Sequence, residues 1–408
     1  MTTEVLSPTS PSKTETFQTG RVLTIVGGHF VHDSFSAFVP PLLPLLIEKL
    51  SLSLTAAGLL TVFIQLPSLF QPFIGYLADR VSVRYFIIFA PAVTAALMSV
   101  LGSAPNYTVL VVLLLLAGVS VAAFHAPAPA MIGRVSGRQI GKGMSFFMFG
   151  GEMGRFAGPL LITAAVSAWA LEGTYPVMVF GLVASFVLYW RLKDVPARSD
   201  QAQLIALPHL WGTMKGVLLP LSSIVLARAF LLVTLSTYLP TFMTGEGATL
   251  WLANSSLAIL ELAGAVGALA GGTLSDRWGR AWVLMIALIA SPLFVLIFLA
   301  TSGWWLLPLL IFMGLTALST TPVLMAIVQE QFPENRALAN GTFLAMMFAI
   351  RSVVTLVVGA VGDLFGLRLA FVVSAIVALS SVPLLRYLPQ PNTPPLPAGE
   401  EGPARKRG

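Results

Sequence analysis

The chain has 408 residues, of which 56% are hydrophobic and only 10% are charged, and its mean hydropathy is +0.87. Soluble domains carry roughly 25% charged residues because a folded surface must be covered with charge. The composition therefore excludes an ordinary soluble enzyme and indicates a membrane protein. The net charge of +6 comes without a long basic run interleaved with aromatic residues, so we expect anionic lipid and no nucleic acid as a partner.

Cysteine is absent and the chain has four histidines. Disulfides, thiolate metal sites and cysteine nucleophiles are thereby excluded, and so few histidines argue against a multi-histidine metal cluster. We expect no metal and no cofactor.

Residues 1–20 are rich in Ser, Thr and Pro and predict a disordered N-terminus without a signal peptide. From Val22 onward, apolar runs of about 20 residues follow one another, which is the length of a helix that crosses a bilayer core. The sequence predicts twelve such helices, over 22–47, 54–78, 84–103, 107–132, 142–166, 174–190, 214–243, 250–274, 282–301, 304–330, 337–360 and 367–388. Residues 389–408 are rich in Pro and Gly and predict a disordered tail.

Lys and Arg residues concentrate on one side of this arrangement. If the N-terminus is cytoplasmic, eighteen of them fall on the cytoplasmic side and two, Lys49 and Arg368, on the outer side. Since cytoplasmic loops carry the excess of Lys and Arg, we expect both termini in the cytoplasm of a cell with a bacterial-type inner membrane. One span more or fewer would scramble the segregation, so the charges also support twelve helices.

A short motif occurs twice in the chain. The two copies, 197 residues apart, are Gly75-Tyr-Leu-Ala-Asp79-Arg80 and Gly272-Thr-Leu-Ser-Asp276-Arg277. Each follows the second span of its half, which indicates two homologous six-helix bundles in an all-α membrane protein. The predicted units are the N-terminal bundle 21–190, the cytoplasmic linker 191–213 and the C-terminal bundle 214–388.

The doubled motif resembles the signature loop of the major facilitator superfamily. The second copy extends the G-x-L-x-D-R-x-G-R pattern to Arg280, whereas the first departs from it at Ser82 and Val83. The resemblance implies two pseudo-symmetric bundles and a gating loop in each half. Asp79 and Asp276 are able to cap a helix N-terminus and to pair with an arginine across the bundle interface. A charged turn that only fixes topology is the alternative.

Within the superfamily, the chain resembles the fosmidomycin resistance proteins. The stretches that carry this likeness are His29 to Asp33, Pro44 to Leu46, Gln65 to Arg80, Phe124-His125, Gln329 to Pro333 and Gly341 to Asp363. The segment from Gly150 through Gly154 to Gly158-Pro159 resembles a motif of antiporters in the superfamily. Glycines four residues apart also let helices approach closely, so helix packing alone explains the segment too.

Charged residues lie well inside the predicted spans. They are Asp33, Glu152, Arg155, Arg228, Glu261 and Arg351, and four of these charges, Glu152, Arg155, Glu261 and Arg351, depart from what the resemblance implies. A charge that faces lipid at a helix centre costs about 2.5–3.5 kcal/mol. We therefore expect the six to face one another or a water-filled cavity. By resemblance, the first, fifth, seventh and eleventh spans line that cavity.

The spacing of these residues suggests their roles. His29 lies four residues from Asp33 and three from His32, so the first helix is able to present an imidazole–carboxylate cluster on one face. We predict proton coupling at Asp33, His29, His32, Glu152 and Glu261. Cationic groups from both halves suit an anionic substrate, and we predict substrate binding at Arg155, Arg228, Arg351, His125 and Gln65.

Structural roles explain several of these residues equally well. Glu152 and Arg155 are three apart and form a plausible buried pair that holds helices together. Arg228 and Arg351 are able to bind backbone carbonyls or an acidic partner. His125 is a lone histidine on an apolar helix, for which packing is a sufficient explanation.

No G-x-x-x-x-G-K-[ST] loop occurs, so an ion gradient is the expected energy source. We predict a monomeric secondary transporter that exports a small organic compound, anionic or of the fosmidomycin type, in exchange for protons. A proton-coupled importer and an uncoupled facilitator have the same parts and remain alternatives, as does a membrane receptor without transport. No nucleophile–base constellation indicates an enzyme.

Overall fold

A computed structural model describes residues 16–70, 84–195, 207–332 and 336–388. The first half of the chain forms α1 (Thr19–Ser36), α2 (Val39–Leu50), α3 (Leu54–Gln65), η1 (Leu66–Phe70), α5 (Arg84–Ser99), η2 (Leu101–Ser103), α6 (Tyr107–His125), α7 (Ala128–Val135), α8 (Ile140–Trp169), η3 (Tyr175–Val177) and α9 (Met178–Leu192). The second half forms α10 (Leu207–Val233), η4 (Thr234–Tyr238), α11 (Leu239–Gly245), α12 (Leu250–Trp278), α13 (Arg280–Leu299), η5 (Gly303–Trp305), α14 (Leu306–Ala317), α15 (Thr320–Gln331), α16 (Arg336–Phe365), α17 (Leu367–Leu379) and η6 (Val382–Tyr387).

Ten helical segments in these ranges are long and apolar enough to cross a bilayer. Two further helices complete the predicted set: the shorter apolar segment Leu54–Phe70 and the 30-residue helix α8, which carries charged side chains in its middle. The predicted all-α membrane fold is confirmed, and the described residues are consistent with twelve spans. Residues 71–78 of the predicted second span lie outside them.

Every third span is interrupted, which the sequence analysis did not predict. The first span breaks between α1 and α2, the fourth between α6 and α7, the seventh at the π-helical turn η4, and the tenth between α14 and α15. A proline follows each break within a few residues, at Pro40, Pro127, Pro240 and Pro322. Proline lacks the backbone N–H that continues a helix and fits a first helical turn. The periodic breaks indicate that each bundle contains a repeated three-helix unit.

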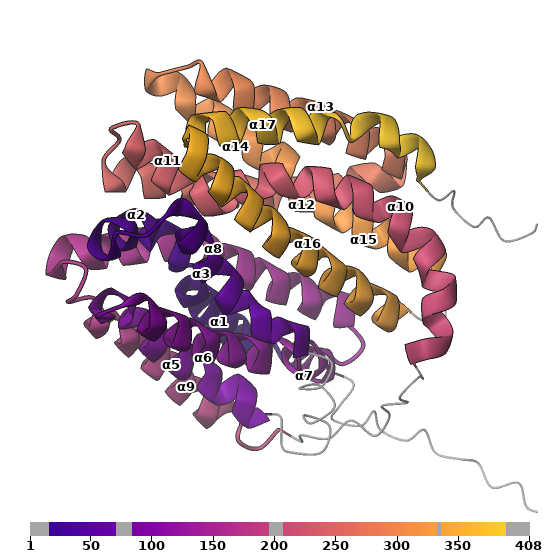
Figure 1. The fold of residues 1–408 in the computed structure, drawn as a ribbon. Coiled ribbons are helices and arrows are strands. Elements are labelled where there is room, and N and C mark those ends of the chain that lie inside the picture. Colours follow the sequence, from indigo (N-terminus) through magenta and orange to yellow (C-terminus); the bar gives the residue numbers. More distant parts are fainter. Residues whose placement is uncertain (1–15, 71–83, 196–206, 333–335, 389–408) are drawn as a thin grey trace, which may run out of the picture.

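The chain folds into two bundles that lie side by side (Figure 1). Two buried apolar clusters lie in the first bundle, one around Phe35 and Leu43 and the other around Phe124 and Ile132. Two matching clusters lie in the second bundle. The helices that make extensive contact between bundles are α3 with α16, α8 with α12, and α2 with α11, η4 and α12.

The two ends of the molecule differ in charge. One end, here called the basic end, carries Arg84, Arg138, Lys193 and Arg280 at the termini of helices. The other, here called the opposite end, is formed by the turns at 51–53, 104–106, 170–174, 246–249 and 300–302. Its two basic residues, Lys49 and Arg368, are each paired with a carboxylate.

Candidate transport site

Three glycines fix how α8 lies against α1. A Cβ atom added to any of them would lie within 2.8 Å of a carbonyl oxygen of α1. The pairs are Gly150 with Val26, Gly154 with Phe30 and Gly158 with Ser34. Because glycines four apart on one helix meet carbonyls four apart on the other, the helices pack backbone to backbone in a single register. Pro159 follows within α8.

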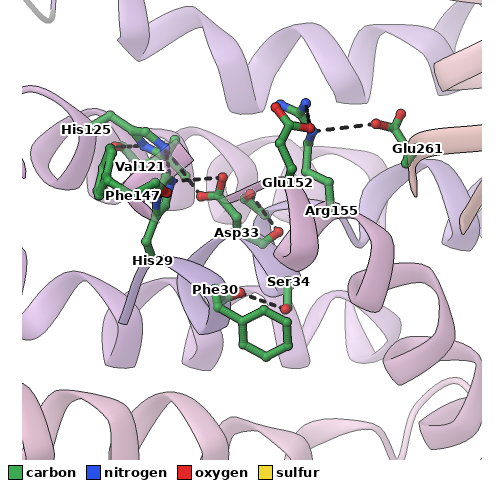
Figure 2. A network of polar contacts seen from close by, with 11 residues as sticks. His29, Phe30, Asp33, Ser34, Val121, His125, Phe147, Glu152, Arg155 and Glu261 are labelled. Atoms are coloured by element: carbon green, nitrogen blue, oxygen red, sulfur yellow. Dashed lines mark hydrogen bonds and ion pairs between the residues drawn. The ribbon is translucent and has the colours of Figure 1, made fainter. Parts of the chain in front are cut away.

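Within this packing, two imidazoles and a carboxylate converge, here called the triad (Figure 2). His29 Nε2 lies 3.2 Å from Asp33 Oδ2, and His125 Nε2 lies 3.3 Å from Asp33 Oδ1. The two Nε2 atoms are 3.3 Å apart. His29 and Asp33 come from α1, one helical turn apart, whereas His125 is the last residue of α6, where the fourth span breaks.

The outer nitrogen of each triad imidazole is held by a backbone carbonyl. His29 Nδ1 lies 2.8 Å from the carbonyl oxygen of Phe147, and His125 Nδ1 lies 3.0 Å from that of Val121. A carbonyl only accepts, so each Nδ1 carries a hydrogen, and a neutral imidazole then directs an Nε2 lone pair at the other imidazole and at Asp33. Three electron-pair donors in contact repel one another. In this arrangement a proton on one Nε2 turns a repulsive contact into a hydrogen bond.

The triad lies in a tightly packed, largely buried environment. His29 and Asp33 are 4% and 7% exposed. Gly151 lines the triad so closely that an added Cβ would lie 2.7 Å from His29 Nε2. His32 is fully buried, stacks on Phe124 at 4.4 Å between ring centroids, and has no hydrogen bond to either ring nitrogen among the described residues.

A chain of charges links the first bundle to the second. Arg155 contacts Glu152 one turn earlier on α8, and its Nε lies 3.5 Å from Glu261 Oε2 on α12. Figure 2 shows Arg155 between the triad side and Glu261, which belongs to the second bundle. The Arg155 side chain is 43% exposed and that of Glu261 is 12% exposed. Two carboxylates thus neutralise one guanidinium at the interface between bundles.

Arg228 and Arg351, the two arginines within spans of the second bundle, are bound by hydroxyl groups where spans are interrupted. Arg228 is 3% exposed and donates to Thr320 and Thr321, at the start of α15. Arg351 Nη2 donates to Ser236 Oγ at 2.8 Å, in the π-helical turn η4. Hydroxyl groups orient a guanidinium without cancelling its charge, so both arginines keep a net positive field in this bundle.

At the opposite end, the two bundles are joined by hydrogen bonds to one carboxylate. Asp363 of α16 accepts from the backbone N–H groups of Leu54 at 2.6 Å and Thr55 at 3.0 Å, and from Thr55 Oγ1 at 2.6 Å. It therefore caps the N-terminus of α3 from the other bundle. Tyr238 Oη also donates across the interface, to the carbonyl oxygen of Leu54 at 3.1 Å.

A second set of bonds joins α8 and α12 at the same end. Asn254 Nδ2 donates to Thr163 Oγ1 at 2.7 Å, and Trp251 Nε1 donates to Ser167 Oγ at 2.9 Å. Asn254 is only 1% exposed. Together with Asp363, these contacts close the opposite end between the bundles.

Two ion pairs at the opposite end stay within single bundles. Lys49 Nζ lies 2.9 Å from Glu172 Oε1, and this hydrogen bond lowers the pKa of Glu172. Arg368 Nη2 lies 2.7 Å from Glu246 Oε2 and lowers the pKa of Glu246 in the same way. Both pairs brace loops rather than the bundle interface.

The second copy of the repeated motif forms ion pairs inside its own bundle. Arg280 Nη1 lies 2.6 Å from Asp276 Oδ1, and Arg280 Nη2 lies 2.7 Å from Glu330 Oε1. These bonds tie α12, α13 and α15 together. The pairing partner of Asp276 is thus a residue of the same bundle and not, as predicted, an arginine across the interface.

The positions of the remaining predicted site residues give no direct support for a role in transport. Gly272 and Arg277 lie on α12, Gly272 faces open space and Arg277 is exposed. Gln65 ends α3 in a half-buried position. Gly75, Asp79 and Arg80 lie outside the described residues.

Comparison with known proteins settles the family. The Major Facilitator Superfamily profile matches residues 25–278 and 254–408. The chain belongs to the major facilitator superfamily. The family resemblance is thereby confirmed, and the chain is a transporter of the kind that carries small molecules, not an enzyme.

Relatives and solved structures agree with this assignment. The fosmidomycin resistance protein of Escherichia coli (strain K12) is 23% identical over 376 residues, covering 88% of this chain and 90% of that protein. The MFS-type transporter YfnC of Bacillus subtilis (strain 168) is 24% identical over 380 residues, covering 90% and 91%.

Among structures, a bacterial homologue of the human lysosomal transporter Spinster, inward-facing and unoccupied, matches with a TM-score of 0.77 at 15% identity, over 91% of this chain and 98% of that one. The nucleoside transporter NupG matches with a TM-score of 0.72 at 14% identity, over 90% and 98%. These two likenesses concern the fold.

Sequence reasoning missed residues that act across the bundle interface. Asp363, Asn254 and Tyr238 were not singled out for a role. Asp363 lies two residues from the end of α16, where a carboxylate usually reads as a surface residue. Asn254 carried a usable signal, because an amide inside a predicted span needs a hydrogen-bond partner.

Proposed function

We propose that this transporter couples proton movement to the export of a small organic compound across a bacterial inner membrane. The observation that carries the proposal is the triad of His29, Asp33 and His125, whose outer nitrogens are bound to carbonyl oxygens so that both Nε2 atoms face the carboxylate and are able to share a proton with it. Intramembrane ionisable groups of this kind mark proton relays and substrate paths. We assign the bundles to residues 21–190 and 214–388, joined by the linker 191–213.

The charge chain provides a route from the triad to the moving bundles. Arg155 interacts electrostatically with Asp33 and with His125, and it also contacts Glu261 across the interface. A proton gained or lost at the triad changes the field at Arg155 and hence the strength of its bond to Glu261. That bond joins the two bundles near mid-membrane, so the protonation state biases their relative orientation.

The conformation fits a transporter that is open toward the cytoplasm. Lys and Arg gather in cytoplasmic loops, so we assign the basic end and both termini to the cytoplasmic side. Asp363, Asn254 and Trp251 then close the outer side through their hydrogen bonds to Leu54, Thr163 and Ser167 of the other bundle. We propose that protons leave the triad toward the cytoplasm in this state and enter it when the outer side opens.

Export requires the proton and the substrate to exclude each other. His125 is the most accessible triad member, with 29% of its side chain exposed. A substrate hydroxyl or ammonium group that donates to His125 Nε2 and Asp33 takes the place of the proton. We propose that Arg155 and Arg351 bind the acidic part of such a substrate. Arg228 instead positions the tenth span through its hydrogen bonds to Thr320 and Thr321.

A proton-coupled importer is the second candidate, and one observation favours it for purely anionic substrates. A proton on the triad adds positive charge beside Arg155, which strengthens the binding of an anion there. By linkage, the anion then strengthens proton binding equally. Proton and anion would move together, whereas a neutral or cationic substrate would compete with the proton and be exported. The likeness to a fosmidomycin resistance protein supports the export reading.

The test uses the purified protein in liposomes with an imposed pH gradient and a pH-sensitive dye inside. Substrates of each charge class are added to the inside or the outside. An antiporter acidifies the lumen as substrate leaves, whereas an importer acidifies the lumen as substrate enters. Downhill flux without any pH change would remove proton coupling from the proposal.

Two matched variants separate the triad from general damage. Asp33→Asn removes the central carboxylate and is expected to abolish proton movement while downhill exchange of labelled substrate continues. Asp194→Asn makes the same chemical change at an exposed position of the basic end and is expected to behave as wild type. Full proton coupling in Asp33→Asn would refute the assigned coupling site.

A further inference from the structure

The triad atoms are spaced as the ligands of a small metal ion are spaced. The separations are 3.2 Å for His29 Nε2 to Asp33 Oδ2, 3.3 Å for His125 Nε2 to Asp33 Oδ1 and 3.3 Å between the Nε2 atoms. Ligands held at about 2.0–2.1 Å in a tetrahedron lie about 3.3 Å apart. An octahedral site at the same bond length would bring them to about 2.9 Å. The spacing matches the tetrahedral edge.

The tautomers required of a metal site are already fixed. Imidazoles that bind metal donate their other ring N–H to a carbonyl or carboxylate, which orients the ring. Here the Nδ1 atoms of His29 and His125 lie at hydrogen-bond distance from the carbonyl oxygens of Phe147 and Val121. Both Nε2 lone pairs are thereby directed at one point, beside a carboxylate.

One ligand atom lacks any hydrogen bond. Asp33 Oδ1 is buried and accepts none among the described residues, although the Asp33 side chain is only 10% exposed. An unsatisfied buried carboxylate oxygen is costly. A cation at the centre of the triad would satisfy it together with both imidazoles. His32 adds a third imidazole nearby, with its ring centroid 5.5 Å from that of His125.

The charges around the triad permit a divalent cation. Arg155 is a guanidinium that interacts electrostatically with Asp33, and its positive charge is offset by contacts with two carboxylates, Glu152 and Glu261. The carboxylate of Asp33 remains to offset part of the charge of the ion. Three protein ligands leave a fourth position for water, which is the composition of an open zinc site. His125, with 29% of its side chain exposed, provides the access.

We propose that the triad binds a divalent transition-metal ion of the Zn²⁺ type, with tetrahedral geometry, in place of the proton. The donor set of two imidazoles and one carboxylate suits Zn²⁺ and Co²⁺, whereas Mg²⁺ and Ca²⁺ prefer oxygen ligands alone. The low number of histidines predicts no metal site. However, three of the four histidines, His29, His32 and His125, lie close together in the fold. Metal binding itself stands on geometry; only its competition with coupling rests on the proposed function.

The exchange has a defined proton balance. Metal ligands must be deprotonated, so an incoming ion displaces the proton held at Nε2 and forms bonds to both Nε2 atoms and to Asp33. One proton is released to solvent for each ion bound. Affinity therefore falls as the pH is lowered. An occupied triad holds no proton, so the ion inhibits proton-coupled transport.

The test is direct binding to the full chain in detergent, prepared without a histidine tag and stripped with a chelator. Zn²⁺ is titrated by calorimetry in two buffers of different ionisation enthalpy, which gives the stoichiometry and the proton release. Co²⁺ is used as a spectroscopic probe, because tetrahedral Co²⁺ absorbs visible light far more strongly than octahedral Co²⁺. We expect one ion per chain, about one proton released and a tetrahedral spectrum.

Variants locate the ion. His29→Gln, Asp33→Asn and His125→Gln are expected to weaken binding about 100-fold each, whereas His209→Gln, outside the triad, leaves it unchanged. Thermal unfolding of each apo-protein checks that the variants are folded. Absence of saturable Zn²⁺ binding in the wild type, an octahedral Co²⁺ spectrum, or binding that survives Asp33→Asn would each overturn the proposal.

The outcome is separable from that of the proposed function. Transport is measured in the presence of a chelator, so that no metal is bound to the triad. If proton coupling fails in that assay, the result of the Zn²⁺ binding experiment still stands. Conversely, a metal-free triad with normal coupling would overturn only the metal site.

Discussion

Asp363 joins the two bundles at the opposite end, so replacing it tests whether this contact holds that end closed. Asp363→Ala removes three bonds at once: those from the N–H groups of Leu54 and Thr55 and from the Thr55 hydroxyl. None of them is made within the second bundle. The substitution should therefore leave the folding of each bundle nearly unchanged and shift the balance between closed and open states.

The size of the shift follows from these bonds. A hydrogen bond to a charged group contributes about 1.5–3 kcal/mol, but this carboxylate is exposed to solvent, which reduces each bond to roughly 1 kcal/mol. Loss of a helix N-cap costs about 0.5–2 kcal/mol. We take about 2 kcal/mol for the whole contact, which is about a 30-fold change in the equilibrium. An end that is closed in about 99% of molecules would be closed in about 75%.

Distances between spin labels measure the change. The chain has no cysteine, so two can be introduced without removing any. Thr108→Cys on α6 and Ser302→Cys before η5 are exposed positions of different bundles at the opposite end. We expect a longer-distance population to rise from about 1% to about a quarter in Asp363→Ala. Thr55→Val, which removes one bond, should lie between.

Glu246→Ala is the matched control. Glu246 lies at the same end, but its partner Arg368 belongs to the same bundle. It should not alter the distance distribution. An unchanged distribution in Asp363→Ala, or an equal change in Glu246→Ala, would refute the assignment of Asp363 as a contact that closes this end.

Three further predictions concern packing and charge. Gly154→Ala should lower the free energy of unfolding by about 1–3 kcal/mol, because its Cβ would meet a backbone carbonyl of α1. Gly141→Ala, whose Cβ would meet nothing within 4 Å, should cause no such loss. Equal thermal stability of the two variants would contradict the close packing of α8 on α1. Gly151→Ala should weaken proton coupling with little loss of expression, measured in the liposome assay, and normal coupling would refute the tight lining of the triad. Because the pKa of Glu172 is lowered, its pair with Lys49 stabilises the fold at pH values above the unperturbed pKa, and this stabilisation is lost as the pH falls through the lowered pKa. Glu172→Gln should therefore reduce the loss of thermal stability at acidic pH. An unchanged dependence of the unfolding temperature on pH would contradict this pairing.

Span number and span order could be read from the sequence, but the breaks within spans were not. The sequence predicts the first span as one helix over 22–47, whereas the structure ends α1 at Ser36 and begins α2 at Val39. Mean hydropathy is taken over a window of about 20 residues, so it does not detect a helix interruption of two residues. The local signal was present in Pro40 and Pro41, which lack the N–H groups that would continue the helix.

The triad shows where reasoning from one sequence ends. The four-residue spacing of His29 and Asp33 is enough to predict their contact, since both lie on one helix face. His125 follows 92 residues after Asp33, and its approach depends on how α1, α6 and α8 pack. Gly150, Gly154 and Gly158 indicate close packing but do not name the partner helix. The third member of the triad, His125, could therefore be identified only from the structure.

The two bundles share their pattern of breaks but differ in how they treat charge. In the first, Arg155 is balanced by two carboxylates, and the ionisable cluster at Asp33 contains its own imidazoles. In the second, Arg228 and Arg351 are bound by hydroxyl groups, which leave their charge uncompensated by contact.

This asymmetry assigns different tasks to the halves. A group whose charge is balanced by a removable proton responds to pH, whereas one held by hydroxyl groups responds to an anionic ligand. We expect the proton to act in the first bundle and an acidic substrate group to act also at Arg351 of the second, with Glu261, which interacts with both Arg155 and Arg351, as the point where the two effects meet. An anion at Arg351 and a proton at the triad both change the electrostatic potential at the Arg155–Glu261 ion pair, so we expect this contact between the bundles to be the one that transport controls.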